Sequence, residues 1–120
     1  MLVDANAEVR RVIRRIVTDL ADRIHECATP RDAYAAYRDC HPDVVVMDLG
    51  TPPCDGIWAT RQILSLHAQA VIVLITPYPD PTFRATAVLA GARGFVLKEN
   101  LLDLRRWLQV TGRCESQKEN

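Results

Sequence analysis

Four short apolar runs, each ending in one polar residue, constrain the fold of this chain more than any other feature. The runs are rich in β-branched residues, which is typical of strands buried on both faces of a parallel sheet. Ligand-binding groups gather beyond the carboxyl ends of such strands. The runs end in Asp4, Asp48, Thr76 and Lys98. We therefore expect two carboxylates, a hydroxyl and an ammonium to meet in one crevice that suits a cation and a phosphoryl group.

Length and charge exclude several other classes of protein. The 120 residues suffice for one domain with its own core, and 15 basic residues balance 15 acidic ones, so no net field attracts nucleic acid or a membrane surface. No apolar run approaches the ~18 residues of a spanning helix, and no signal peptide is visible. Four dispersed cysteines favour reduced thiols in a cytoplasmic protein over a zinc site; they are Cys27, Cys40, Cys54 and Cys114.

Segments with helical period lie between the apolar runs. Asn6, Thr29 and Asp80 are the expected N-caps, and proline follows the last two at the first helical position. The arginines at positions 10, 11, 14 and 15 are interpreted as a solvated helix face. Residues 50–56 are expected to be a loop, with Asp55-Gly56 as a turn, and residues 111–120 a frayed polar tail. The expected helices cover residues 9–20, 30–40, 57–67, 81–91 and 101–108, and a weaker edge strand covers residues 23–28.

This order is a β-α unit repeated five times with short connections. Right-handed crossovers then predict an α/β fold over residues 1–110: a flavodoxin-like, doubly wound, five-stranded parallel sheet with helices on both faces. The usual strand order is 2-1-3-4-5, with its switch point between the first and third strands. Those two strands carry Asp4 and Asp48, so sequence order and site chemistry agree.

The four polar residues suggest phosphoryl transfer to a carboxylate. Neighbouring carboxylates repel each other, and Mg²⁺ is a natural cation to keep both Asp4 and Asp48 ionised. A carboxylate oxygen of Asp48 can then attack phosphorus and form an acyl phosphate. Lys98 and Thr76 would bind the phosphoryl oxygens through charge and a donated hydrogen bond.

The chain resembles the receiver domain of two-component response regulators. The matching segments are residues 2–4, residues 42–49, Pro52 with Asp55-Gly56, residues 75–76 and residues 91–98. The resemblance implies a cytoplasmic phosphorelay protein whose Asp48 accepts a phosphoryl group from a histidine kinase or histidine phosphotransfer protein. It implies no enzymatic activity beyond this self-catalysed transfer and slow hydrolysis of the aspartyl phosphate.

The resemblance also assigns roles to individual residues. Asp4, Asp48 and the backbone carbonyl of Gly50 match the ligands of Mg²⁺, and Thr76 and Phe95 match the pair that switches on phosphorylation. The segment leading into Lys98 resembles the branch usually fused to a helix-turn-helix output domain, so either the chain acts alone or a DNA-binding output domain lies outside it. Homodimerisation through the last two strands and their helices stays open.

Two positions depart from the family pattern. Ala5 stands where receivers usually carry a second acid, so weak Mg²⁺ affinity is expected. Pro77 follows Thr76 where most of the family has a free N–H that points at a phosphoryl oxygen. One such hydrogen bond to a charged group is worth roughly 1.5–3 kcal/mol. Both departures favour weak phosphorylation or signalling without phosphate.

Three other functions are alternatives to phosphoacceptance. A degenerate receiver would act as a phosphorylation-independent protein-interaction module. A phosphatase with an aspartate nucleophile needs a second acid two residues on, where this chain has Gly50. A flavin-binding domain of this topology needs a phosphate loop rich in serine, threonine and glycine after the first strand, which residues 4–8 do not provide.

Overall fold

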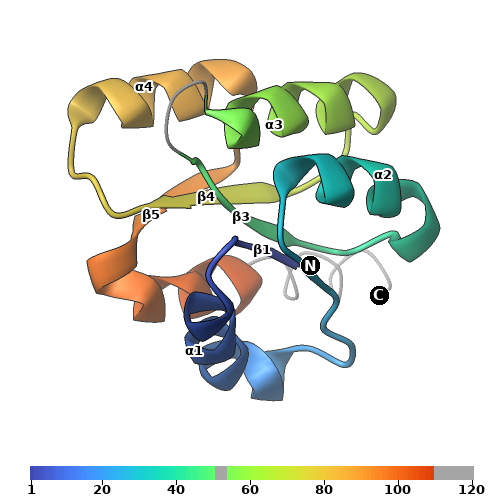
Figure 1. The fold of residues 1–120 in the computed structure, drawn as a ribbon, viewed down its shortest axis with the longest axis vertical. Coiled ribbons are helices and arrows are strands. Elements are labelled where there is room, and N and C mark those ends of the chain that lie inside the picture. Colours follow the sequence, from blue (N-terminus) through green and yellow to red (C-terminus); the bar gives the residue numbers. More distant parts are fainter. Residues whose placement is uncertain (51–53, 110–120) are drawn as a thin grey trace.

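The computed structural model describes residues 1–50 and 54–109 of the chain. Figure 1 shows a central sheet with helices above and below it. Five parallel strands lie in the order β2-β1-β3-β4-β5, which confirms the flavodoxin-like fold predicted from the sequence. The elements in chain order are β1 (Leu2–Val3), α1 (Ala7–Val17), η1 (Thr18–Leu20), β2 (Glu26–Cys27), α2 (Pro30–Cys40), β3 (Val45–Asp48), α3 (Asp55–Leu66), β4 (Ile72–Thr76), α4 (Pro81–Ala90), β5 (Gly94–Leu97) and η2 (Lys98–Asp103).

The neighbouring strands β3 and β4 divide the core into two layers. Met47 and Leu74 pack on the face covered by α2, α3 and α4. Val46 and Val73 pack on the opposite face, against α1 and residues 101–108. All four side chains are almost fully buried, because successive side chains along each strand point to opposite faces of the sheet and both faces are covered by apolar groups.

Local sequence signals set most of the helix boundaries. The Asn6 side chain accepts hydrogen bonds from the backbone N–H groups of Glu8 and Val9 and begins α1. Thr29 and Asp80 cap α2 and α4 in the same way, each followed by proline. Gly91 ends α4 in the left-handed region with φ of 100°, as glycine does at little cost. These caps confirm the sequence predictions.

Several boundaries differ from the prediction. The helix expected over residues 9–20 is α1 (Ala7–Val17) followed by the 3₁₀-helix η1 (Thr18–Leu20). The edge strand is Glu26–Cys27 and not residues 23–28, because β1, its only partner in the sheet, is itself two residues long. Helix α3 begins at Asp55, so Asp55 and Gly56 form its first turn and not a separate turn. The last segment starts as the 3₁₀-helix η2 and is α-helical over residues 104–109, with a kink at Asn100.

Parts of two predicted segments lie outside the described residues. They are positions 51–53 of the loop and the tail at residues 111–120. Among the residues that the structure does describe, no helix has the length and apolarity needed to cross a bilayer.

Candidate functional site

Strand register brings the four predicted polar residues to one edge of the sheet. Val3 lies beside Met47, Asp48 beside Ile75 and Thr76 beside Leu97. The next residue along β1 is Asp4 and the next along β5 is Lys98. All four polar residues therefore stand at the carboxyl ends of neighbouring strands, where the order β2-β1-β3 creates the switch point.

Lys98 joins the two carboxylates. Its Nζ lies 2.8 Å from Oδ2 of Asp4 and 3.1 Å from Oδ1 of Asp48. The Asp4 side chain is only 4% exposed, whereas those of Lys98 and Asp48 are 20% and 25% exposed. We call these three residues the Asp4–Lys98–Asp48 cluster. Asp48 is therefore the more accessible of the two carboxylates, and a reagent would meet it before Asp4.

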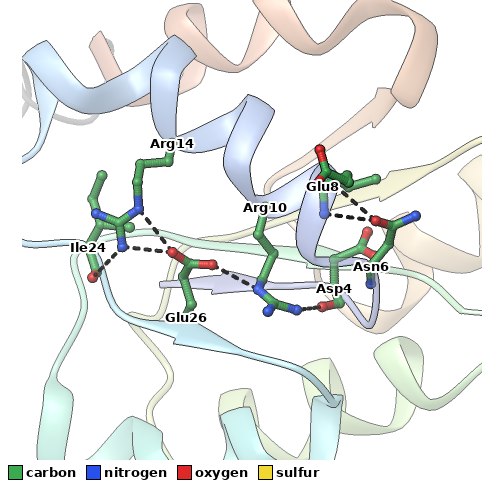
Figure 2. Close-up of polar contacts among 8 residues, drawn as sticks. Asp4, Asn6, Glu8, Arg10, Arg14, Ile24 and Glu26 are labelled. Carbon is green, nitrogen blue, oxygen red and sulfur yellow. Dashed lines mark hydrogen bonds and ion pairs between the residues drawn. The ribbon is translucent and has the colours of Figure 1, made fainter.

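Asp4 is held at several of its polar atoms. Its Oδ1 accepts a hydrogen bond of 2.8 Å from the backbone N–H of Asn6, and its own N–H donates to the carbonyl of Cys27 at 3.1 Å. Its backbone carbonyl accepts a hydrogen bond from the guanidinium of Arg10, as Figure 2 shows. Its Oδ2 is buried, and no hydrogen bond of ordinary geometry reaches it among the described residues. The Lys98 ammonium, 2.8 Å away, is the ion-pair partner of this oxygen.

Burial disfavours the charged form of Asp48. Desolvation raises the pKa of Asp48 above its usual range, and the charge of Asp4 acts in the same direction, while Lys98 and the backbone N–H of Gly50 act against them. Burial alone would lower the pKa of Lys98, but its contacts with Asp4 and Asp48 outweigh burial and raise it. Lys98 therefore stays cationic at neutral pH. Asp48 is a carboxylate whose charge is poorly compensated, which is common at functional sites.

Thr76 lies at the same edge but is not joined to the cluster. It is almost fully buried, and its Oγ1 accepts a hydrogen bond of 3.3 Å from the backbone N–H of Tyr78. Pro77, between them, has no N–H to donate. No hydrogen bond links the Thr76 hydroxyl to Asp4, Asp48 or Lys98 within the part of the chain that the structure describes. The Thr76 hydroxyl, which accepts this hydrogen bond, can still donate one of its own.

Phe95 lies in a groove between α4 and the segment that follows β5. The groove has a volume of about 260 Å³, and the Arg84 guanidinium lies 5.9 Å from the centre of the Phe95 ring. The ring is partly exposed on one side and packs against the α2–α4 layer of the core on the other. Phe95 is therefore a half-buried aromatic residue in a groove, apart from the Asp4–Lys98–Asp48 cluster.

The start of α3 packs directly on the end of β3. A Cβ atom on Gly56 would lie 2.4 Å from the backbone oxygen of Asp48, so only glycine fits there. Gly50 has φ of 86°, and its carbonyl is 3.9 Å from the Cys54 thiol, the length of a weak hydrogen bond. Gly56 and Gly50 thus shape the backbone around Asp48.

The donors present fit a divalent cation such as Mg²⁺. Asp4 and Asp48 supply hard carboxylate oxygens, and the buried Oδ2 of Asp4 is paired with the Lys98 ammonium. Gly50 could add its carbonyl. Ala5 adds no oxygen, and no group of three His, Cys, Asp or Glu suited to a metal exists among the described residues. Mg²⁺ accepts such a sparse set because water completes its coordination.

Three contributors were not predicted from the sequence. Arg10 was interpreted as part of a solvated face, but its side chain is only 18% exposed and binds Asp4 and Glu26, so that interpretation was wrong for this residue. Tyr78 acts through its backbone N–H, for which the proline-rich sequence gives no signal. Gly56 was identified as a turn residue and as part of the family resemblance, but its close approach to the backbone of Asp48 was not predicted.

The chain is similar in sequence to known proteins. The family model described as "response regulator receiver domain" matches residues 1–108. The chemotaxis protein CheY of Halobacterium salinarum is 33% identical over 98 residues, which cover 82% of each chain. Regulatory protein AtoC of Escherichia coli is 31% identical over 103 residues, and the match spans 86% of this chain but only 22% of AtoC.

A solved structure agrees with these matches. A LuxR-family two-component response regulator from Aurantimonas sp. SI85-9A1 superposes with a TM-score of 0.83 at 35% identity, over 92% of this chain and 81% of that chain. The family match covers nearly all of the described residues, and CheY is a relative of similar length. The resemblance noted in the sequence is therefore confirmed, and the chain belongs to the receiver domains of two-component response regulators.

Proposed function

We propose that Asp48 is the phosphoacceptor of this receiver domain and takes a phosphoryl group from a histidine kinase or a histidine phosphotransfer protein. The observation that carries the proposal is the Lys98 ammonium, 3.1 Å from an Asp48 oxygen at the switch point of the sheet. Asp48 is also the more exposed of the two carboxylates, so a bulky donor can reach it.

The chemistry is a displacement at phosphorus. An Asp48 oxygen forms the new bond to phosphorus, the bond from phosphorus to the donor nitrogen breaks, and the imidazole leaves with that electron pair and takes up a proton. Lys98 offsets the negative charge that arrives beside Asp48. The Thr76 hydroxyl donates its hydrogen to a phosphoryl oxygen. Hydrolysis of the acyl phosphate by water returns Asp48 to its starting state.

Asp4, Asp48 and the Gly50 carbonyl are the residues that would hold Mg²⁺. When bound, the cation would neutralise charge on the phosphoryl oxygens. Ala5 leaves the site one carboxylate short, so affinity for the cation is low. Pro77 removes a donor that would otherwise stabilise the phosphoryl group. Phosphorylation is therefore slower, or the product shorter-lived, than in a receiver with both features.

The switch pair is Thr76 and Phe95. In the structure the Thr76 hydroxyl faces the Tyr78 N–H, and Phe95 lies in the groove next to Arg84. A phosphoryl group on Asp48 would draw the Thr76 hydroxyl toward β3, and the ring of Phe95 would turn inward. Two packings that differ by a few kcal/mol suffice for such a population shift.

Signalling then requires a partner that recognises the altered surface. Related regulators such as AtoC are much longer than this chain, which supports an output carried by another domain or protein. The proposed location is the cytoplasm, where histidine kinases present their phosphoryl groups. A homodimer through β4, β5 and their helices would be one form of output.

Beryllofluoride, a mimic of the phosphoryl group, tests this function. With Mg²⁺ present, we expect shift changes in the ¹H–¹⁵N spectrum that centre on residues 48–50 and extend to Thr76 and Phe95. Asp48→Asn is the matched control and should show none of them. A native spectrum that stays unchanged would contradict phosphoacceptance and leave a phosphorylation-independent interaction module.

A further inference from the structure

Arg10 lies at the centre of a polar network that joins three elements next to the Asp4–Lys98–Asp48 cluster. From α1, its Nη1 donates to the backbone carbonyl of Asp4, and its Nε donates to Oε1 of Glu26 on β2 at 2.8 Å (Figure 2). Arg14, one turn further along α1, binds the other oxygen of Glu26 at 2.7 Å. Glu26 thus fixes the direction in which the Arg10 guanidinium points.

The contact from Arg10 completes the restraint of Asp4. Asp4 follows the last residue of β1, and its buried carboxylate contacts Lys98. Cys27 holds its N–H, Asn6 holds Oδ1, and Arg10 holds the carbonyl. The Arg10 contact is the one that fixes the peptide plane between Asp4 and Ala5. Without it, the peptide could rotate and displace the Asn6 N–H that holds Oδ1, and the carboxylate could then turn away from Lys98.

We propose that Arg10, oriented by Glu26, is a positioning residue that sets the geometry of Asp4 and so the cation affinity and phosphorylation rate of the site. Arg10 does not touch the reacting atoms; it acts through the backbone of Asp4. The rate readout rests on the proposed function of Asp48, but the binding and spectroscopic readouts below do not. A planar guanidinium suits this role because it binds a carboxylate and a carbonyl at once in a fixed geometry.

Arg10→Met tests the proposal, with Arg14→Met as the matched control. Both variants remove one positive charge and one partner of Glu26 from the same helix, but only the first removes the contact with Asp4. For Arg10→Met we expect phosphorylation by acetyl phosphate at saturating Mg²⁺ to slow about tenfold, the loss of one hydrogen bond from a charged donor. Arg14→Met should keep a rate within about twofold of the native rate.

The sign of the change in Mg²⁺ affinity distinguishes a positioning role of Arg10 from a simple effect of its positive charge. Removing a cation near two carboxylates would by itself strengthen Mg²⁺ binding, whereas a misplaced Asp4 weakens it. We expect weaker binding in Arg10→Met. The amide proton of Asn6 should also move toward the position of an unbonded amide, because its acceptor on Asp4 is displaced. Arg10→Lys keeps the charge but has one nitrogen for two acceptors, so it should still phosphorylate more slowly than the native protein.

Several outcomes would overturn the proposal. One is a phosphorylation rate in Arg14→Met as slow as that in Arg10→Met, and another is a native phosphorylation rate in Arg10→Lys. The others are tighter Mg²⁺ binding in Arg10→Met and an Asn6 amide proton whose shift does not change in Arg10→Met. Failure of the native protein to take up phosphate would instead refute the phosphoacceptor role, while Mg²⁺ affinity and the Asn6 signal would still decide the role of Arg10. Glu26→Gln combined with Arg10→Met should be no slower than Arg10→Met alone, since Glu26 acts through Arg10.

Discussion

Lys98→Met would show how strongly the ammonium holds the site together. The substitution keeps the long apolar stem but leaves Asp4 and Asp48 facing each other without a counter-ion. Loss of one partner from a buried ion pair costs about 3–5 kcal/mol. Lys98 and Asp48 are 20% and 25% exposed, which places the expected loss at the lower end, about 3 kcal/mol. The melting temperature would then fall by about 10 °C.

The pH dependence of this loss has a definite sign. Without Lys98 the pKa of Asp48, which burial already raises, would rise further. When a carboxyl group has a higher pKa in the folded state than in the unfolded state, the protein loses stability as pH rises through the folded-state pKa. It regains that stability as pH falls below the unfolded-state pKa. The deficit of Lys98→Met should therefore be largest at neutral pH and shrink in mild acid.

Urea unfolding, followed by tryptophan fluorescence at neutral pH and in mild acid, measures the loss in the free energy of unfolding. Arg11→Met is the control, because the Arg11–Glu8 pair is exposed and its loss should cost well under 1 kcal/mol. Saturating Mg²⁺ should stabilise Lys98→Met more than the native protein, since the cation replaces the missing ammonium. A deficit no larger than that of Arg11→Met, or one that grows in acid, would refute this account of the cluster.

Three further substitutions test the surroundings of Asp48. Ala5→Asp should tighten Mg²⁺ binding in a fluorescence or calorimetric titration, because it adds the missing carboxylate; unchanged affinity would contradict the explanation for weak binding. Asp48→Asn should stabilise the fold at neutral pH, with a gain that fades below the unfolded pKa of aspartate, because burial raises the pKa of Asp48; denaturation curves at two pH values decide this. Gly56→Ala should destabilise the protein by about 2–3 kcal/mol, since its Cβ would meet the Asp48 backbone oxygen; a smaller loss in urea unfolding would mean that α3 can shift at little cost.

Strands and helix caps could be predicted because their signals are local. The apolar run at residues 44–47 needs to be buried on both faces, and this requirement also fixed where Asp48 would emerge. The Asn6 side chain caps the start of α1, and Gly91 adopts the left-handed conformation that ends α4, so each signal is visible in the residue itself. The order of five β-α units then left one common topology, which the structure confirms.

Long-range contacts could not be predicted in this way. Asp55-Gly56 has the composition of a turn, and only the close approach to Asp48 explains why it opens α3. Arg10 has the spacing of an exposed helix residue, yet its long side chain reaches back to β1. Thr76 reaches the expected edge of the sheet, but its partner is the backbone N–H of Tyr78. For Gly56 and Arg10 the deciding atom is a backbone oxygen of another segment, and for Thr76 it is the backbone N–H two residues on.

Intact mass after incubation with acetyl phosphate and Mg²⁺ tests the central claim most directly. The native protein should gain the mass of one phosphoryl group, and the adduct should be lost in mild base, as an acyl phosphate is. Asp48→Asn should gain nothing under the same conditions. A native protein that stays unmodified, or an adduct that persists in Asp48→Asn, would contradict the claim that Asp48 is the phosphoacceptor.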